Sequence, residues 1–184
     1  MTPSSYLASV AAAYAGFDQA LELNPPLPAD ARAALLEKLG FELPEWLNQL
    51  WQCADGGPDY QPVFARPNYF TGADFLSVAD AMDMRDRLRG IAGNYIGWQE
   101  DKPRDPRVRD GWFLDGWVPF AAFGGSTIVL FADCDPAPGG TAGQVIAFVH
   151  DPDQISLLAP DGESYLQQSL DWFTDQAEDF VPEE

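Results

Sequence analysis

The sequence has one histidine and two cysteines, so few of its residues suit metal or nucleophilic chemistry. A metal site would join His150 to Asp133 and Asp135. Calcium needs a flexible loop with a Glu at its twelfth position, whereas this segment carries Pro136 and Pro138. Zinc needs more His or Cys at close spacing. We therefore assign no metal site, and expect Asp133 and Asp135 to form Asx-type hydrogen bonds that shape the turn before Pro136.

Signals for covalent catalysis are equally sparse. The segment Gly125-Ser126-Thr127 lacks the glycine that a nucleophile elbow places two residues after its serine. The glycine-rich segments contain no Lys, which excludes a phosphate-binding P-loop. A thiol–imidazole pair of Cys53 and His150 stays open, although its flanking residues do not support it. We therefore assign no catalytic residue and no cofactor.

Any functional site would have to be positioned by strands, which are predicted mainly in the second half of the chain. Apolar runs rich in Val, Ile and Phe alternate there with turns rich in Gly, Pro and Asp. The runs are joined by short links, which favours an antiparallel meander. The predicted strands are 60–65, 117–123, 126–132, 145–149 and 154–159.

Helical periodicity covers the first half and the end of the chain. Capping residues and prolines mark the starts of the predicted helices. These helices run from Thr2 to about Leu21, from Asp30 to Leu39, from Pro44 to about Ala54, from Asp74 to about Trp98 with a break near Gly90, and from a cap at Asp161 or Ser164 to about Phe173.

Together these elements predict an α+β fold, with N-terminal helices, a curved mostly antiparallel sheet and a C-terminal helix packed on it. At 184 residues we expect a single domain. It would consist of a first helix and Pro-rich linker at 1–28, a core at 29–174 and an acidic tail at 175–184 that frays.

A series of short motifs recurs in order along the chain. Upstream lie Leu43-Pro44, Leu50-Trp51 and Asp55-Gly56-Gly57. Downstream, W-x-P-F, a Gly-Gly pair, D-x-D-P and G-x-x-G-Q-V-I comprise Trp117, Pro119, Phe120, Gly124, Gly125, Asp133, Asp135, Pro136, Gly140, Gly143, Gln144, Val145 and Ile146. From about Leu39 to Trp172 this order resembles the SUKH superfamily. That superfamily includes fungal cell-wall assembly regulators and many bacterial immunity proteins.

The charge of the chain is strongly negative and unevenly distributed. The formal net charge is −19, of which −8 lies in residues 1–84 and −14 in residues 110–184, where there is no Lys or Arg. Residues 85–109 carry +3. Such a field repels nucleic acid and anionic lipid and attracts a basic partner. Solubility, or an acid-rich host proteome, would explain the same composition without any partner.

The basic segment at residues 85–110 allows two interpretations. It is either an anion-binding or partner-docking patch, or a solvated loop whose arginines pair with nearby acids. We favour the second, because only Trp98 and Trp112 are placed to stack on nucleotides.

Several features favour a cytoplasmic protein. No run of about 18 apolar residues is present, and no Lys or Arg precedes Arg32 as a secretory signal would require. Cys53 and Cys134 are therefore expected to be reduced core thiols.

The resemblance to the SUKH superfamily implies a non-enzymatic immunity protein that binds and neutralises a cognate toxin, often a nuclease. A nuclease presents a basic face, which an acidic protein can cover. Because most of the net negative charge lies after residue 110, we place the hypothetical interface at an acidic end of the meander, near Asp133, Asp135, Asp151 and Asp153, together with the rim of the sheet. The alternatives are a regulatory or scaffold protein of the cell-wall regulator type, and a small hydrolase that uses Cys53 and His150.

Overall fold

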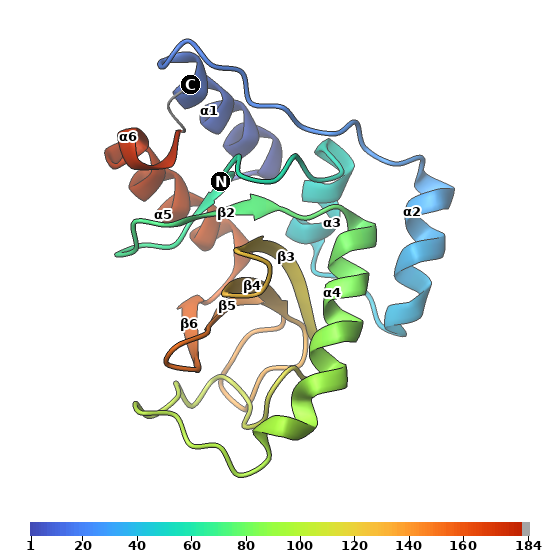
Figure 1. Cartoon of the computed structure of the whole chain (residues 1–184). Helices are drawn as coiled ribbons and strands as arrows, with labels where there is room; N and C mark the ends of the chain where they lie inside the picture. The colour runs from blue at the N-terminus through green and yellow to red at the C-terminus, as the bar shows by residue number, and fades with distance from the viewer. Residues whose placement is uncertain (182–184) are drawn as a thin grey trace.

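A computed structural model describes residues 1–181, which form one six-stranded antiparallel sheet with helices around it (Figure 1). The strands are ordered as in the sequence, so each pairs with the strand that follows it. They are β1 (Phe64–Ala65), β2 (Gly72–Phe75), β3 (Trp117–Phe123), β4 (Ile128–Asp133), β5 (Gln144–Val149) and β6 (Gln154–Ala159). The sheet curls into a half-barrel, and the predicted α+β class is confirmed.

The helices lie on both sides of this sheet. They are α1 (Pro3–Ala15), α2 (Ala29–Leu36), η1 (Glu37–Leu39), α3 (Glu45–Cys53), α4 (Val78–Ile91), η2 (Ala92–Tyr95), α5 (Gly162–Asp175) and α6 (Ala177–Phe180). The helices α1, α3 and α5 cover one face of the sheet, and α4 with residues 92–116 covers the other. Because both faces are covered, β4 is buried along its whole length, which explains its unbroken apolar sequence.

The first face is centred on Phe64 of the short strand β1. Its ring stacks on Tyr6 of α1 with centroids 5.4 Å apart and makes edge contacts with Phe75 and Phe120. Tyr165 of α5 lies 6.4 Å from it. This aromatic group brings α1, α5 and three strands into one core.

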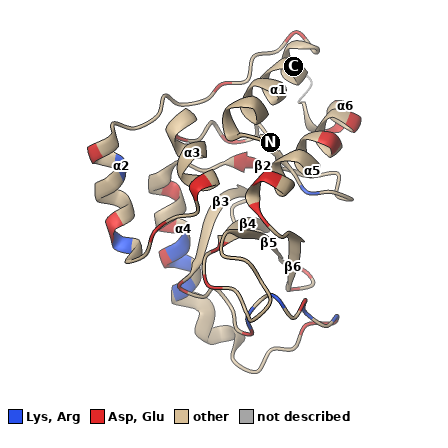
Figure 2. Cartoon of the chain, turned by 180° about the vertical axis from the view of Figure 1, so that it is seen from behind, with Lys and Arg blue, Asp and Glu red and all other residues tan. Residues whose placement is uncertain are grey.

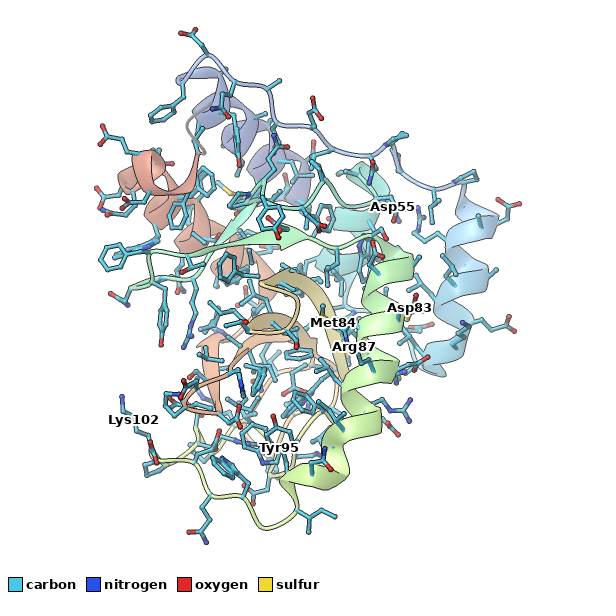
Figure 3. All side chains as sticks on the ribbon, in the orientation of Figure 1. Asp55, Asp83, Met84, Arg87, Tyr95 and Lys102 are labelled. Carbon is cyan, nitrogen blue, oxygen red and sulfur yellow. The ribbon has the colours of Figure 1, made fainter. Side chains whose placement is uncertain are left out.

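The second face is closed by the basic segment and the residues that follow it. Trp112 and Phe113 are buried there against Phe148 of β5, at centroid distances of 6.0 and 5.2 Å. Tyr95 stacks on Trp112 at 4.6 Å and lies beneath the sheet (Figure 3). The basic segment, which contributes to none of the sequence motifs, and the residues after it therefore cover this face of the core.

Asp55 and Ser77 together fix the start of α4. The Asp55 carboxylate accepts a hydrogen bond from the Val78 amide at 2.9 Å, and the Ser77 side chain accepts one from the Asp80 amide. Figure 3 shows Asp55 beside this helix end. The Asp-Gly-Gly motif therefore both ends α3 and caps α4.

Three predicted helix boundaries are wrong. Asp74 does not begin a helix, because it belongs to β2 and pairs with Ala122 of β3. The first helix ends at Ala15 rather than Leu21, since the chain turns at Asp18, which has a positive φ. Asp30 lies in the first turn of α2, whose N-cap is Pro28.

The acidic tail does not fray where the structure describes it. After α5 the chain forms α6, and Phe180 stacks on Phe173 with centroids 5.1 Å apart. Phe180 and Val181 are buried, so the packed part of the chain extends to Val181. Residues 182–184 of the predicted tail lie outside the described part.

Side-chain hydroxyl groups form hydrogen bonds with the backbone carbonyl and amide groups along the outer edge of β1. Tyr14 donates to the Pro62 carbonyl at 2.9 Å, Tyr6 to the Val63 carbonyl at 2.7 Å and Tyr165 to the Ala65 carbonyl at 3.1 Å. The Ala65 amide donates to the hydroxyl of Ser169 at 2.8 Å. Four helical residues therefore take the place of a neighbouring strand.

We predict that Ser169→Ala lowers the free energy of unfolding by about 1–3 kcal/mol, because the buried Ala65 amide loses its acceptor. Urea unfolding followed by circular dichroism measures this loss. Ser4→Ala is the matched control, since Ser4 is exposed on α1 and its substitution should change stability by less than about 0.5 kcal/mol. Equal stabilities of the two variants would contradict the proposed role of the hydroxyl group.

Candidate functional site

The four aspartates proposed from the sequence do not form one surface. Asp133 ends β4 and pairs with Gln144, whereas Ile128 at the other end of β4 pairs with Val149. Asp151 and Asp153 follow Val149, so they lie at the opposite end of these strands from Asp133 and Asp135. Six residues separate the two ends by roughly 17–20 Å. The expectation of a single acidic end is therefore wrong.

Asp133 has a structural role in the connection between β4 and β5. Its side chain is fully buried and accepts hydrogen bonds from Gln144 Nε2 at 2.9 Å and from the Asp135 amide at 3.1 Å. Burial raises the pKa of this carboxyl group. The predicted Asx-type bond is confirmed for Asp133, whereas the Asp135 side chain pairs with Arg109 instead. Asp133 offers no surface to a partner in this conformation.

Asp135 is exposed, but its charge is partly compensated. Its carboxylate forms an ion pair with Arg109 at 2.7 Å. Three further arginines of the basic segment form ion pairs with nearby acids: Arg104 with Glu100, Arg107 with Asp105, and Arg89 with Asp115. Arg85 donates to the Asp115 backbone carbonyl. The interpretation that local acids pair with these arginines is confirmed. Figure 2 shows this basic group on the end of α4 and the loop beneath the sheet.

Two long basic side chains in this segment make no ion pair within residues 1–181. They are Arg87 on α4 and Lys102 in the following loop (Figure 3). Arg87 borders a hollow of about 470 Å³ between β2, α4 and the β3–β4 turn. The acids around this hollow are Asp59, Asp74, Asp80 and Asp83. Burial raises the pKa of Asp74, and Asp80 accepts a hydrogen bond from Ser77.

The geometry gives no support to a Cys53–His150 catalytic pair. His150 Nδ1 is 2.7 Å from the carboxylate of Asp153, which is the partner of the ring. Cys53 is an exposed free thiol at the end of α3, and partial desolvation raises its pKa, which disfavours the nucleophilic thiolate. Cys134 is also free and half-buried, and burial raises its pKa to about 12. The expectation that both thiols lie in the core is therefore wrong for Cys53.

No group of three or more metal-ligating side chains comes together within residues 1–181. None of the helices in this part of the chain is long and apolar enough to cross a bilayer.

Three of the motif residues, Pro44, Phe120 and Gly143, lie instead around Trp46 at the start of α3. The indole Nε1 donates to the Gly143 carbonyl at 3.0 Å, and the ring makes an edge contact with Phe120 at 5.2 Å. Gly162 at the start of α5 lies directly against the indole, where a Cβ atom would overlap the ring. Gly143 has a φ of 87°, and a Cβ atom there would lie 2.8 Å from Pro44. Gly162 therefore lets the start of α5 pack against the start of α3, and Gly143 lets the β4–β5 loop approach Pro44.

A groove of about 840 Å³ opens above this junction and is the largest hollow that we describe. Its apolar lining includes Met1, Pro44 and Trp46, with exposed Ala142 from the β4–β5 loop. Its acidic lining residues are Glu45, Asp161 and Glu163, and no Lys or Arg side chain lines it. Glu45 and Glu163 are exposed, whereas Asp161 caps α5 by accepting from the Ser164 amide at 2.7 Å. A lining of apolar and acidic side chains suits a basic or amide-rich protein segment.

Sequence reasoning missed this groove for an identifiable reason. Its acids come from the first turns of two helices that are more than 100 residues apart in the chain. In the sequence, each acid considered alone has the position of an ordinary helix-capping or first-turn residue. The available signals were the motif glycine Gly143 and, outside the motifs, Gly162 beside Asp161, because glycines mark where backbones approach closely.

One family comparison bears on this architecture. The model of the SMI1 / KNR4 family (SUKH-1) matches residues 26–168 of the chain, which confirms the resemblance drawn from the motifs. The match includes the groove residues from Pro44 to Gln168 and all six strands. A search of curated proteins finds no match.

We predict that Gly162→Ala lowers the free energy of unfolding by about 1–3 kcal/mol, because the new methyl group overlaps the Trp46 indole. Chemical unfolding of the two proteins measures the difference. Gly90→Ala is the matched control, since Gly90 lies in α4 with open space around it. That substitution should stabilise the helix by up to about 1 kcal/mol. A neutral Gly162→Ala variant would contradict the close packing.

We also predict that the ring of His150 titrates above the usual value of about 6.5. The hydrogen bond and the charge of Asp153 raise its pKa. Because the folded-state pKa is raised, the pair contributes stability below the unfolded pKa, and this contribution is lost as the pH rises through the folded pKa. Proton NMR of this single histidine measures the midpoint. Asp153→Asn should lower it clearly and Asp151→Asn only slightly, and equal shifts would exclude Asp153 as the partner.

Proposed function

Because the chain belongs to the SMI1 / KNR4 family (SUKH-1), we propose that it is an immunity protein that binds and neutralises a cognate toxin. The observation that carries this proposal is the family match over residues 26–168. The absence of a supported catalytic pair among residues 1–181 is consistent with a function in protein binding.

We propose the groove above Trp46 as the centre of the toxin-binding surface. Its exposed acids Glu45 and Glu163 point to a partner with basic side chains. The groove lies at the end of the sheet where β4 ends and β5 begins, so exposed Asp135 belongs to the same end. The opposite end, with Asp151 and Asp153, is then a separate surface, and buried Asp133 makes no direct contact.

This location supports a simple mode of inhibition. A toxin that acts on nucleic acid binds phosphates through Lys and Arg side chains. An acidic groove that pairs with those side chains would compete with the phosphates for the same face. The net charge of −19 would also accelerate the encounter, and added salt would slow it.

The first experiment is capture of partners from the native host by the full chain at low and at moderate salt. The immunity proposal predicts a basic protein that is released as the salt concentration rises. Expression of that protein alone should be toxic, and coexpression with this chain should restore growth. A housekeeping protein retained at every salt concentration, with no toxicity of its own, would favour a regulatory or scaffold function instead.

We predict that the double variant Glu45→Lys/Glu163→Lys binds the captured toxin at least tenfold more weakly, which corresponds to about 1.4 kcal/mol or more. Two attractive charges become repulsive in this variant, so the salt dependence of the affinity should also decrease. Isothermal titration calorimetry at two salt concentrations measures both effects. Asp135→Lys should weaken binding less, because Arg109 already offsets this carboxylate.

The matched control is Asp151→Lys/Asp153→Lys, which makes the same change of charge at the opposite end of the sheet. If only this control variant loses affinity, the toxin binds at the β5–β6 turn and the groove is excluded. If all variants bind equally well, neither acidic surface contacts the toxin.

A further inference from the structure

Arg66 is an unusual cation in this acidic protein. It follows β1 directly, and only 7% of its surface is exposed. The chain carries 29 Asp and Glu residues against 10 Lys and Arg residues, so carboxylates are abundant. Arg66 nevertheless forms no ion pair within residues 1–181.

The hydrogen bonds of Arg66 are also incomplete. Its Nη2 reaches the hydroxyl of Ser156 on β6 only at 3.5 Å, and its Nη1 is buried without any acceptor. The guanidinium lies 3.7 Å from the centre of the Tyr69 ring, which supplies a cation–π contact and covers it. Burial lowers the pKa of Arg66, which is the physical sign of a charge held away from water.

An unpaired buried guanidinium favours a specific ligand. Its planar fork of donors matches the two oxygens of a carboxylate. The Arg66 charge is already removed from water in the free protein. A carboxylate that reaches the guanidinium is therefore attracted to it at little further cost of desolvating Arg66. The site is therefore prepared for an anionic group.

The loop beside Arg66 has the composition of a protein-binding surface. Phe70 is 73% exposed, and Tyr69 is partly exposed. The backbone of this loop is held by two hydrogen bonds, from the Tyr69 amide to the Arg66 carbonyl at 3.0 Å and from Trp172 Nε1 to the Tyr69 carbonyl at 2.9 Å. Both bonds involve the backbone of Tyr69 and not its ring, which is 37% exposed. Arg and aromatic residues dominate the binding energy of protein interfaces.

We propose that Arg66 binds a carboxylate of a partner protein, with the Tyr69 ring turning aside to admit it and Phe70 packing on an apolar neighbour of that carboxylate. This site has the opposite sign to the acidic groove and does not depend on the partner being a toxin. A protein carboxylate fits better than a nucleic acid or a lipid surface, because the field of the whole chain repels such polyanions.

The experiment uses the full chain labelled with ¹⁵N and two small probes. The first probe is the capped dipeptide N-acetyl-Leu-Glu-amide, and the second is its neutral counterpart N-acetyl-Leu-Gln-amide. The NMR signals of the Arg66 Nε–H and the Trp172 indole N–H report on the site. We expect both signals to shift saturably with the Glu probe, and at least fivefold less with the Gln probe at the same concentration.

Three variants test the separate parts of the proposal. Arg66→Lys keeps the positive charge but loses the fork, so the affinity for the Glu probe should fall at least fivefold. Tyr69→Ala uncovers the guanidinium and should raise the affinity several-fold. Phe70→Ala, an exposed position that the fold does not need, should weaken binding of the probe.

The outcomes that overturn the proposal are equally specific. Absence of a saturable shift in the wild-type chain, or equal shifts with the Glu and Gln probes, would exclude a carboxylate site without any use of a variant. Unchanged affinity in Arg66→Lys would exclude recognition by the fork, and the amide spectrum of that variant shows whether it has folded. Unchanged affinity in Tyr69→Ala would exclude the ring as a cover.

Discussion

The hydrogen bonding of β1 is the constraint on which the arrangement of this fold depends. A half-barrel has two free edges, and the edge at β1 would leave buried backbone groups without partners. The hydroxyl groups of Tyr6, Tyr14, Tyr165 and Ser169 satisfy these groups, which fixes α1 and α5 against the same strand. The helix α1 lies before residue 26, where the family match begins, yet it supplies two of the four hydroxyls.

The sequence predicted the elements whose signals are local and missed those that depend on distant partners. The strand β6 was predicted with its observed bounds, and β3 likewise, because turn residues flank each apolar run. The strand β2 was mistaken for the start of a helix, since four residues show no clear period and their partner in β3 is more than 40 residues away. The burial of Phe180 was missed for the same reason, because it depends on contact with Phe173.

The same contrast between local signals and distant contacts applies to the candidate site. The motifs predicted the family, but several of their residues shape the core: Gly143 lies against Pro44 and Trp46, Asp133 holds a turn, and Asp55 caps α4. Residues that specify a fold need not contact a partner. The four aspartates were grouped because most of the net negative charge lies after residue 110, and only the register of β4 and β5 shows that they lie at opposite ends. The exposed acids of the groove carry no motif and could be found only in three dimensions.

The acidic groove and the Arg66 site can belong to one interface, because both lie along α5. Ser164 and Gln168 line the groove, and Trp172 binds the loop that carries Tyr69. These three residues are spaced by four, so they lie on the same face of the helix. The distance from Gly162 to Trp172 along the helix axis is about 15 Å. A standard interface of about 800 Å² per partner is roughly 30 Å across, which is enough to cover both. A basic partner with one carboxylate placed about 15 Å from its basic centre would match this face in both charge and spacing, whereas a uniformly basic surface would leave Arg66 unpaired.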